Sequence, residues 1–379
     1  MVRVLVAMSG GVDSSVAAAL LAERGHEVVG ATLKLWGGAS DSGCCSVADV
    51  EDARRVAEQL GIAHYVFDDT GSFERHVVAP YVSAHTRGRT PNPCVECNRH
   101  LKFGVLLDRA LRLGFDALAT GHHARVSTDP PRPRLRRGID RAKDQSYVLS
   151  MLQVDQLARL VLPVGERTKD EVRAEARRLG LRTATKPDSQ DVCFIHSGRG
   201  RAGFLGDRVP LHQGTVVDDA SGVVVGTVPA VELVTVGQRR GLGHGPGGSR
   251  RFAVSVDVAG RRVRVGDARA VRARGVALGE WTWVDGPLPL GAPVIVQSSA
   301  HGLPVPAVLV AGGIEFDEPQ RLVAPGQTAA FYDPGDPDVV IGSAVAASID
   351  AAAPSAPSAP SAPAPSAARA APAASAAGA

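Results

Sequence analysis

Residues 8–15 read Met-Ser-Gly-Gly-Val-Asp-Ser-Ser and stand between a short apolar run and a stretch with helical spacing. The two glycines allow backbone N–H groups to turn toward an anion. The N-terminus of the following helix adds partial positive charge. Asp13 is a poor direct ligand for phosphate, so we expect it to bind Mg²⁺ attached to pyrophosphate. Because no Lys follows the glycines, the pattern predicts a phosphate loop that differs from a Walker A loop.

Cys94 and Cys97 form a Cys-x-x-Cys pair at the end of a Pro-rich stretch, just before a helix predicted to begin near Asn98. A thiol at a helix N-terminus beside basic residues is favoured as the thiolate, which predicts a nucleophile. The basic residues are Arg99, His100 and Lys102. The pair also fits half of a zinc site or a redox disulfide. A zinc site needs four ligands, however, and the sequence holds no second Cys-x-x-Cys.

The other cysteines stand in different surroundings. Cys193 follows the polar run 186–192 and precedes two apolar residues. This position fits a buried small side chain or an exposed loop that ends in a short strand, and the polar run favours the loop. Cys44 and Cys45 are adjacent, and we expect a non-catalytic role for them because neighbouring cysteines rarely bond each other.

The elements that must position these residues alternate between strand and helix over the first 125 residues. We predict strands at 2–7, 27–33, 64–68 and 116–120, and helices at 14–23, 47–60, 73–85 and 101–113. This alternation predicts an α/β domain, with a parallel sheet covered by helices on both faces.

After about residue 205 the pattern changes to short Val-rich runs separated by Gly, Pro and Asp, which predicts an all-β barrel or sandwich. We therefore divide the chain into four parts. These are an α/β catalytic domain at 1–204, a small central domain at 205–264, a β-barrel domain at 265–349, and a tail at 350–379. The tail consists almost entirely of Ala, Pro and Ser, and we expect it to be disordered.

Composition excludes several classes of protein. The 42 basic and 39 acidic residues give a net charge of +3, which excludes a polycation. There is no apolar run long enough to cross a membrane and no signal-peptide pattern at the N-terminus. Five cysteines are too few for a secreted disulfide scaffold. We expect a soluble cytoplasmic protein.

Basic residues are concentrated in particular segments. The segment from Arg125 to Lys143 holds seven basic and two acidic residues, which predicts a phosphate-binding arm or, alternatively, a solvated surface loop. Arg239, Arg240 and the arginines of 261–274 extend the basic surface.

Six motifs occur in order along the chain: SGGVDS (9–14), PNPCVECN (91–98), ATGHHAR (119–125), KDQSYVL (143–149), KPDSQDVCFI (186–195) and VGQRRGLG (236–243). Together they resemble the bacterial tRNA-specific 2-thiouridylase (MnmA) family over about residues 1–349. The first motif resembles the PP-loop of enzymes that split ATP into AMP and pyrophosphate. The resemblance implies ATP-dependent 2-thiolation of the wobble uridine of tRNA, by adenylation of O2 and sulfur transfer from a cysteine persulfide.

The resemblance also implies roles for individual residues. Cys97 would be the nucleophile and Cys193 the persulfide carrier, and the two would pair in a transient disulfide. The implied ATP site is Ala7, Met8, Ser9, Gly10, Gly11, Val12, Asp13, Ser14, Leu33 and Gly121. The implied tRNA contacts are Asn92, Pro93, Cys94, His122, Lys143, Asp144, Gln145 and Gln327. The implied cofactor is Mg²⁺ with ATP, and the implied partners are tRNAs for Lys, Glu and Gln and a cysteine desulfurase or sulfur-relay protein.

The sequence departs from the family pattern at two places. Cys94 stands where many members have Asp, and Ser299-Ala300-His301 stands where relatives have an Arg-Tyr-Arg-like contact. The first departure opens an alternative, in which Cys94, Cys97 and Cys193 hold a [4Fe–4S] cluster whose open iron carries sulfide. Another PP-loop adenylating enzyme, such as an amide-forming synthetase, and a non-catalytic RNA-binding protein are further alternatives.

Overall fold

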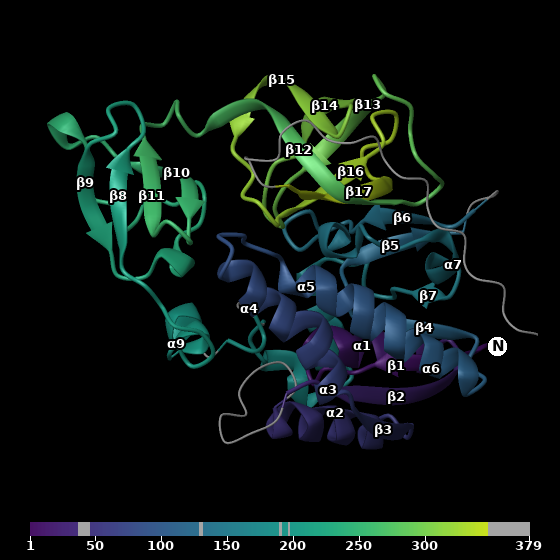
Figure 1. Cartoon of the computed structure of the whole chain (residues 1–379). Coiled ribbons are helices and arrows are strands. Elements are labelled where there is room, and N and C mark those ends of the chain that lie inside the picture. Colours follow the sequence, from purple (N-terminus) through teal and green to yellow (C-terminus); the bar gives the residue numbers. More distant parts are fainter. Residues whose placement is uncertain (37–45, 129–131, 189–191, 196–197, 348–379) are drawn as a thin grey trace, which may run out of the picture.

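The computed structural model describes residues 1–36, 46–128, 132–188, 192–195 and 198–347. Cys44, Cys45 and the predicted disordered tail lie outside the described residues. Figure 1 shows a helix-covered sheet, a β-barrel packed over it, and a smaller sheet to one side. Within the described part of the chain, no helix is long and apolar enough to cross a bilayer.

The N-terminal sheet confirms the predicted parallel α/β architecture. Its order is β3 (Ala63–Asp68), β2 (Glu27–Lys34), β1 (Arg3–Ala7), β4 (Ala117–Thr120) and β7 (Leu160–Val161). Every neighbouring pair in it is parallel. Both faces of β1 are buried, because Val4 and Val6 join one apolar cluster and Leu5 joins another. Such two-sided burial explains why the strand reads as a continuous apolar run.

Two sets of helices cover the two faces of this sheet. The first set is α1 (Val12–Glu23), α2 (Val47–Gln59) and α8 (Lys169–Arg178). The second set is α3 (Thr70–Phe73), η1 (Glu74–Val78), α4 (Ala79–His85), α5 (Pro93–Glu96), η2 (Cys97–Leu106) and α6 (Leu107–Arg112). Reciprocal capping boxes at Ser46 and Thr168 define where α2 and α8 begin.

The rest of the described chain forms short connecting elements, which include a two-stranded sheet, together with a four-stranded sheet and a closed barrel. The connections are β5 (Ala124–Ser127), β6 (Arg134–Arg137), η3 (Ser146–Leu149), α7 (Val154–Leu157), η4 (Arg182–Thr185), α9 (Gly200–Gly206), η5 (Val231–Leu233) and η6 (Pro246–Gly248). The smaller sheet has the order β10 (Phe252–Asp257), β11 (Arg262–Gly266), β8 (Gly214–Asp218) and β9 (Val224–Val228). The closed barrel has the order β12 (Arg272–Trp283), β15 (Gly313–Arg321), β14 (Val305–Val310), β13 (Pro293–Gln297), β16 (Thr328–Tyr332) and β17 (Val340–Ala346).

The closed barrel confirms the predicted C-terminal β fold. The predicted boundary after residue 264 falls inside β11, which ends at Gly266. The proposed division of the chain otherwise stays a prediction.

The basic segment 125–143 differs from the expected phosphate-binding arm. It contains the β5–β6 hairpin, and its arginines pair with acidic residues near the end of the barrel. Arg125 and Arg141 both bind Asp338, and Arg136 binds Asp336 at 2.8 Å. These pairs attach the segment to the barrel, so it forms a junction between the α/β domain and the barrel.

Arg137 is the buried centre of this junction. It is 8 % exposed, and its guanidinium lies 3.6 Å from the ring centroid of Tyr332. It donates to Asp144 at 2.9 Å and to Gln297 at 2.8 Å. Burial raises the pKa of Tyr332 to about 12, so the ring stays neutral at physiological pH.

We expect Arg137→Ala to lower the free energy of unfolding by about 3–5 kcal/mol, because the change leaves the buried carboxylate of Asp144 without its cation. Urea denaturation followed by circular dichroism measures this loss. Arg132→Ala is the control, because Arg132 and Asp285 are both exposed and 3.6 Å apart. The control should cost less than about 1 kcal/mol, and equal losses in both variants would contradict the assignment.

Candidate active site

The phosphate loop lies at the point where the order of the parallel sheet reverses. β2 and β3 lie on one side of β1, and β4 and β7 lie on the other. Ala7 at the end of β1 pairs with Thr120 at the end of β4. The loops that follow these two strands therefore leave the same edge of the sheet side by side. In open α/β sheets this switch point is where ligands bind.

Two glycines are required for this close approach. Gly10 has φ +70°, and a Cβ there would lie 2.2 Å from the carbonyl oxygen of Asp49. A Cβ on Gly121 would lie 2.5 Å from the backbone nitrogen of Ser14 and 2.6 Å from the carbonyl carbon of Asp13. Gly11 precedes α1 without a side-chain cap, which leaves the helix N-terminus available to an anion.

Asp13 faces two groups from distant parts of the chain. Lys169 Nζ donates to both of its carboxylate oxygens at 2.7 Å, and His123 Nε2 lies 3.2 Å from Oδ1. Burial disfavours the charged form of Asp13. The hydrogen bonds from His123 and Lys169 outweigh this effect and hold its pKa below the ordinary value. The site therefore offers one ionised carboxylate beside a phosphate loop, which fits Mg²⁺ because that ion takes its other ligands from phosphates and water.

Asp188 is the second carboxylate of this charged cluster. Its carboxylate accepts from Lys143 at 2.8 Å, from Lys169 at 2.9 Å and from Arg173 at 2.7 Å. Burial opposes its ionisation, but the hydrogen bonds from Lys143 and Lys169 hold its pKa well below its usual range. Two carboxylates thus meet three permanent cations, and this surplus of positive charge favours a polyphosphate ligand.

Lys186 attaches the same segment to the phosphate loop itself. Its ammonium group donates to the carbonyl oxygen of Gly10 at 2.9 Å, to Asp49 at 2.6 Å and to Asp52 at 2.8 Å. Residues 186–188 are therefore bound on one side to the phosphate loop and α2, and on the other to the cluster around Asp188.

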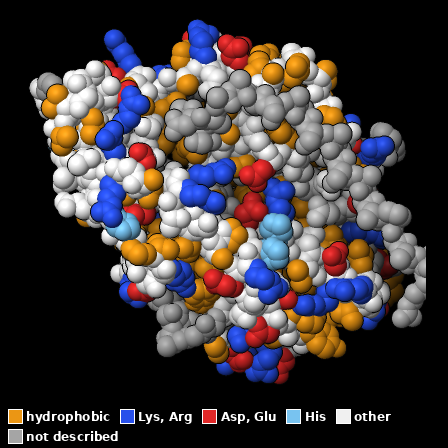
Figure 2. Space-filling model, in the orientation of Figure 1, with side chains coloured by type: hydrophobic (Ala, Val, Ile, Leu, Met, Phe, Trp, Pro, Cys, Tyr) orange, Lys and Arg blue, Asp and Glu red, His pale blue; other side chains and the backbone are white. Residues whose placement is uncertain are grey.

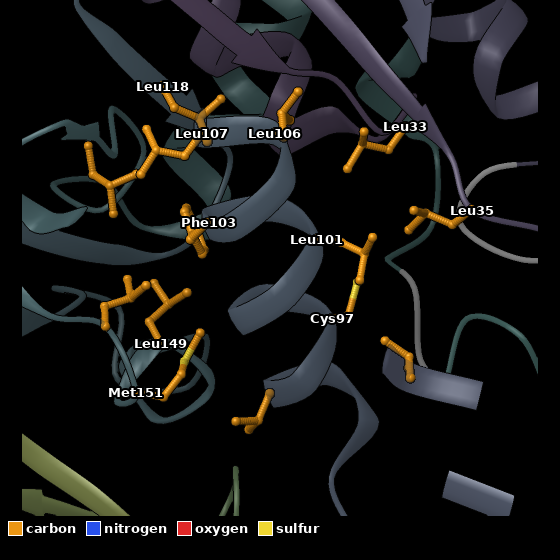
Figure 3. Close-up of a cluster of buried hydrophobic side chains, with 14 of the residues drawn as sticks. Leu33, Leu35, Cys97, Leu101, Phe103, Leu106, Leu107, Leu118, Leu149 and Met151 are labelled. Atoms are coloured by element: carbon orange, nitrogen blue, oxygen red, sulfur yellow. The ribbon is translucent and has the colours of Figure 1, made fainter. Parts of the chain in front are cut away.

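Cys97 lies inside the apolar core on the opposite side of the sheet from α1. It is 8 % exposed and belongs to the same cluster as Leu33 and Leu101. Figure 3 shows Cys97 and Leu101 on the part of η2 near Leu33 and Leu35. Cys97 begins a π-helical segment of ten residues. Such segments are rare and often mark functional sites.

The helix before Cys97 begins earlier than predicted. It starts at Pro93 and is capped by Asn92, whose side chain accepts from the backbone N–H of Cys94 at 3.0 Å. Cys97 therefore does not stand at a helix N-terminus, and the argument for its thiolate from that position is wrong. Glu96 also lies 3.5 Å from Arg99 and 3.3 Å from His100, which offsets part of the nearby positive charge.

Cys193 lies in a turn rather than at the start of the predicted short strand. The N–H of Ile195 donates to the carbonyl of Val192 at 2.9 Å. Phe194 is buried and contacts Phe73, Tyr81 and Phe204 at centroid distances of 5.0–5.6 Å. Cys193 is half-buried and packs against the apolar cluster that contains Cys97. The fold thus brings the two implied catalytic cysteines into one cluster.

Among the described residues, no three Cys, His, Asp or Glu side chains are grouped so that they could hold a metal ion. Cys94 is exposed, whereas Cys97 is buried.

The residues implied to contact tRNA are already engaged within the chain in several cases. Asp144 accepts from Arg137, Gly138 and Ser146. His122 is buried, and its Nδ1 lies 2.7 Å from the hydroxyl oxygen of Thr120.

Lys143 pairs with Asp188, and Gln145 accepts from the backbone N–H of His123 at 2.8 Å. Gln327 donates to the carbonyl of Thr90, which brings it beside the loop of Asn92, Pro93 and Cys94. Their roles in tRNA binding stay predictions.

Sequence reasoning did not assign His123, Lys169, Lys186 or Asp188 to the site. His123, Lys186 and Asp188 lie within the motifs already quoted, which was the available signal. Lys169 gave none, because it is the first residue of a helix and lies 156 positions from its partner Asp13.

The chain is similar to known protein families over most of its length. Residues 2–197 match the family model described as a tRNA methyl transferase HUP domain, and residues 274–346 match an aminomethyltransferase beta-barrel domain. The chain is 46 % identical over 364 residues to tRNA-specific 2-thiouridylase MnmA of Mycolicibacterium paratuberculosis, covering 91 % of this chain and 99 % of that protein. The chain is also 46 % identical to tRNA-specific 2-thiouridylase MnmA of Mycobacteroides abscessus, over 90 % of this chain and 99 % of that protein.

Solved structures are more distant. The U34-tRNA thiolase NcsA from Methanococcus maripaludis with its [4Fe-4S] cluster is 19 % identical, with a TM-score of 0.34 over 54 % of this chain and 63 % of that chain. An overlap this low carries no argument about ligands.

We expect Gly121→Ala to weaken Mg²⁺–ATP binding at least about tenfold, or about 1.4 kcal/mol. The added methyl group would displace the backbone of Asp13 and Ser14. Isothermal titration calorimetry measures the affinity. Gly226→Ala is the matched control, because its Cβ would meet open space. Wild-type affinity in Gly121→Ala would show that nucleotide binds elsewhere.

Proposed function

The chain belongs to the tRNA-specific 2-thiouridylase family of sulfurtransferases, and on that premise we propose that it replaces O2 of the wobble uridine of tRNA with sulfur in an ATP-dependent reaction. O2 of the uridine attacks the α-phosphorus of ATP, and pyrophosphate leaves. Mg²⁺ held by Asp13 and the phosphates would neutralise the charge on that leaving group. The N-terminus of α1 and the ammonium group of Lys169 would stabilise the same negative charge.

Sulfur transfer then proceeds through the two cysteines of the apolar cluster. The terminal sulfur of a persulfide on Cys193 attacks C2 of the uridine, and AMP departs with the former O2. The thiolate of Cys97 next attacks Sγ of Cys193, which breaks the S–S bond to the base and releases 2-thiouridine. The two cysteines are left as a disulfide, which a thiol reductant must reduce before the next cycle.

One observation supports this proposal above the others. Residues 186–188 and 192–195 contact the two different parts of the proposed site. Lys186 binds the phosphate loop at Gly10, and Cys193 packs on the cluster that contains Cys97. An amide-forming synthetase of the PP-loop type requires no such link between a phosphate loop and two cysteines. A non-catalytic RNA-binding protein requires neither the loop nor the cysteines.

We expect Cys97→Ala and Cys193→Ala each to abolish 2-thiouridine, because each removes one sulfur atom from the relay. Cys94→Ala should retain activity. The measurement is nucleoside mass spectrometry on wobble-uridine tRNA incubated with ATP, Mg²⁺ and a persulfide donor. Loss of activity in Cys94→Ala, together with iron in the wild-type protein, would instead establish the cluster mechanism. If the tRNA stays unmodified while ATP is still split to AMP and pyrophosphate, the protein adenylates a substrate other than the wobble uridine.

The basic surface that suits tRNA lies on and beside the smaller sheet rather than on segment 125–143. Residues 239–274 include ten arginines and two aspartates. Figure 2 shows Lys and Arg side chains on the part of the molecule where Figure 1 places β8–β11. Arg239 and Arg240 are exposed on a loop that Arg321 binds through the carbonyl of Gly237. Within the described residues, Arg264 is the member of this stretch that pairs with a carboxylate, that of Asp219.

We expect the double change Arg239→Ala and Arg240→Ala to weaken tRNA binding and to reduce the slope of log K against log salt by about two, if each arginine contacts one phosphate. Filter binding over a salt series measures both quantities. Arg54→Ala is the control, since that exposed arginine on α2 pairs with Glu51. An unchanged slope in the double variant would place the tRNA elsewhere.

The remaining expectations rest on the family resemblance. The sulfur donor, the preference for tRNAs of Lys, Glu and Gln, and the cytoplasmic location stay predictions.

A further inference from the structure

The position of Lys169 is electrostatically unfavourable for its positive charge. It is the first residue of α8, where the helix dipole disfavours a cation. It is also only 8 % exposed, so its charge has lost most of its hydration. Two carboxylates, those of Asp13 and Asp188, compensate for both costs.

The two carboxylates belong to different functional parts of the proposed enzyme. Asp13 stands in the phosphate loop, and Asp188 stands five positions before Cys193. The backbone of Lys169 is fixed, because its N–H donates to Asp140 at 2.9 Å and its helix begins in a capping box. The ammonium group contacts both carboxylates at once, and the flexible side chain that carries it is the part of Lys169 that can shift.

Nucleotide binding must disturb this arrangement. Lys169 now holds both oxygens of Asp13 at 2.7 Å. Mg²⁺ binds a carboxylate oxygen at about 2.0–2.1 Å, which leaves no room for the same pair of hydrogen bonds. The ammonium group then turns toward the phosphates, and Asp188 loses one of its three cations.

We propose that Lys169 is a positioning residue that couples occupancy of the nucleotide site to the segment carrying Cys193, through Asp13 on one side and Asp188 on the other. The proposal rests on the function proposed above. It makes the reactivity of Cys193 depend on whether Mg²⁺–ATP is bound, so that sulfur chemistry and adenylation occur together.

The test compares the rate at which a maleimide alkylates Cys193 with and without Mg²⁺ and a non-hydrolysable ATP analogue. Peptide mass spectrometry resolves the sites, and the exposed Cys94 is the internal reference. In the wild type we expect the nucleotide to raise the Cys193 rate at least about fivefold, the lower end of typical coupling. Lys169→Met and Asp188→Asn should both bring the ratio to within about twofold of one, and Lys169→Arg should restore part of it.

Arg178→Met is the matched control, because it removes a cation from the exposed end of the same helix. It should keep the wild-type ratio. Asp188→Asn decides the case if Lys169→Met also weakens nucleotide binding, since Asp188 does not contact Asp13. A wild-type ratio near one, or an unchanged ratio in both variants, overturns the proposal.

The tRNA assay separates this proposal from the function on which it rests. Coupling without 2-thiouridine in the wild type would mean that the proposed substrate is wrong while the role of Lys169 stands. Formation of 2-thiouridine without coupling would mean that the proposed function stands and that Lys169 does not couple the two sites.

Discussion

The cost of burying charge shapes the centre of this molecule. Asp13 and Asp188 are half-buried, with side chains 30 % and 21 % exposed, and each stays ionised because cations from other elements face it. A buried carboxylate without a partner would instead take up a proton. The phosphate loop, the N-terminus of α8 and the segment before Cys193 therefore have to meet at one place. Most of the site geometry follows from that requirement.

A second consequence concerns how the domains are joined. Segment 125–143 has the charge of a nucleic-acid-binding arm, yet its arginines face Asp336 and Asp338. Phosphate oxygens and carboxylate oxygens are recognised by the same guanidinium geometry, so composition cannot separate the two partners. Arg137 differs from these arginines because its charge is buried between Asp144, Gln297 and the ring of Tyr332. Its position fixes the barrel against the loop that precedes Tyr147.

Features encoded in neighbouring residues were accessible from the sequence. The strand–loop–helix unit at Asp13 and the alternation of strands and helices depend on short-range patterns, and both were predicted correctly. The start of the helix at Pro93 was missed, although an Asn cap followed by Pro at the first helical position is a recognisable signal. Lys169 could not have been found, because its role depends on partners 156 and 19 positions away that only the folded chain brings together. The arginine pairs near Asp338 could not be predicted for the same reason, since they join residues about 200 positions apart.

The position of segment 186–195 limits how the two halves of the chemistry can relate. Lys186 and Asp188 attach its beginning to the nucleotide site, and Phe194 attaches its end to the aromatic core beside α4. A persulfide is easily lost to any passing thiol, and an adenylated uridine is easily lost to water. An enzyme with independent sites would waste both intermediates. In the proposed mechanism, nucleotide binding at residues 186–188 is felt at Cys193, and the order of the two steps is then set by the protein rather than by diffusion.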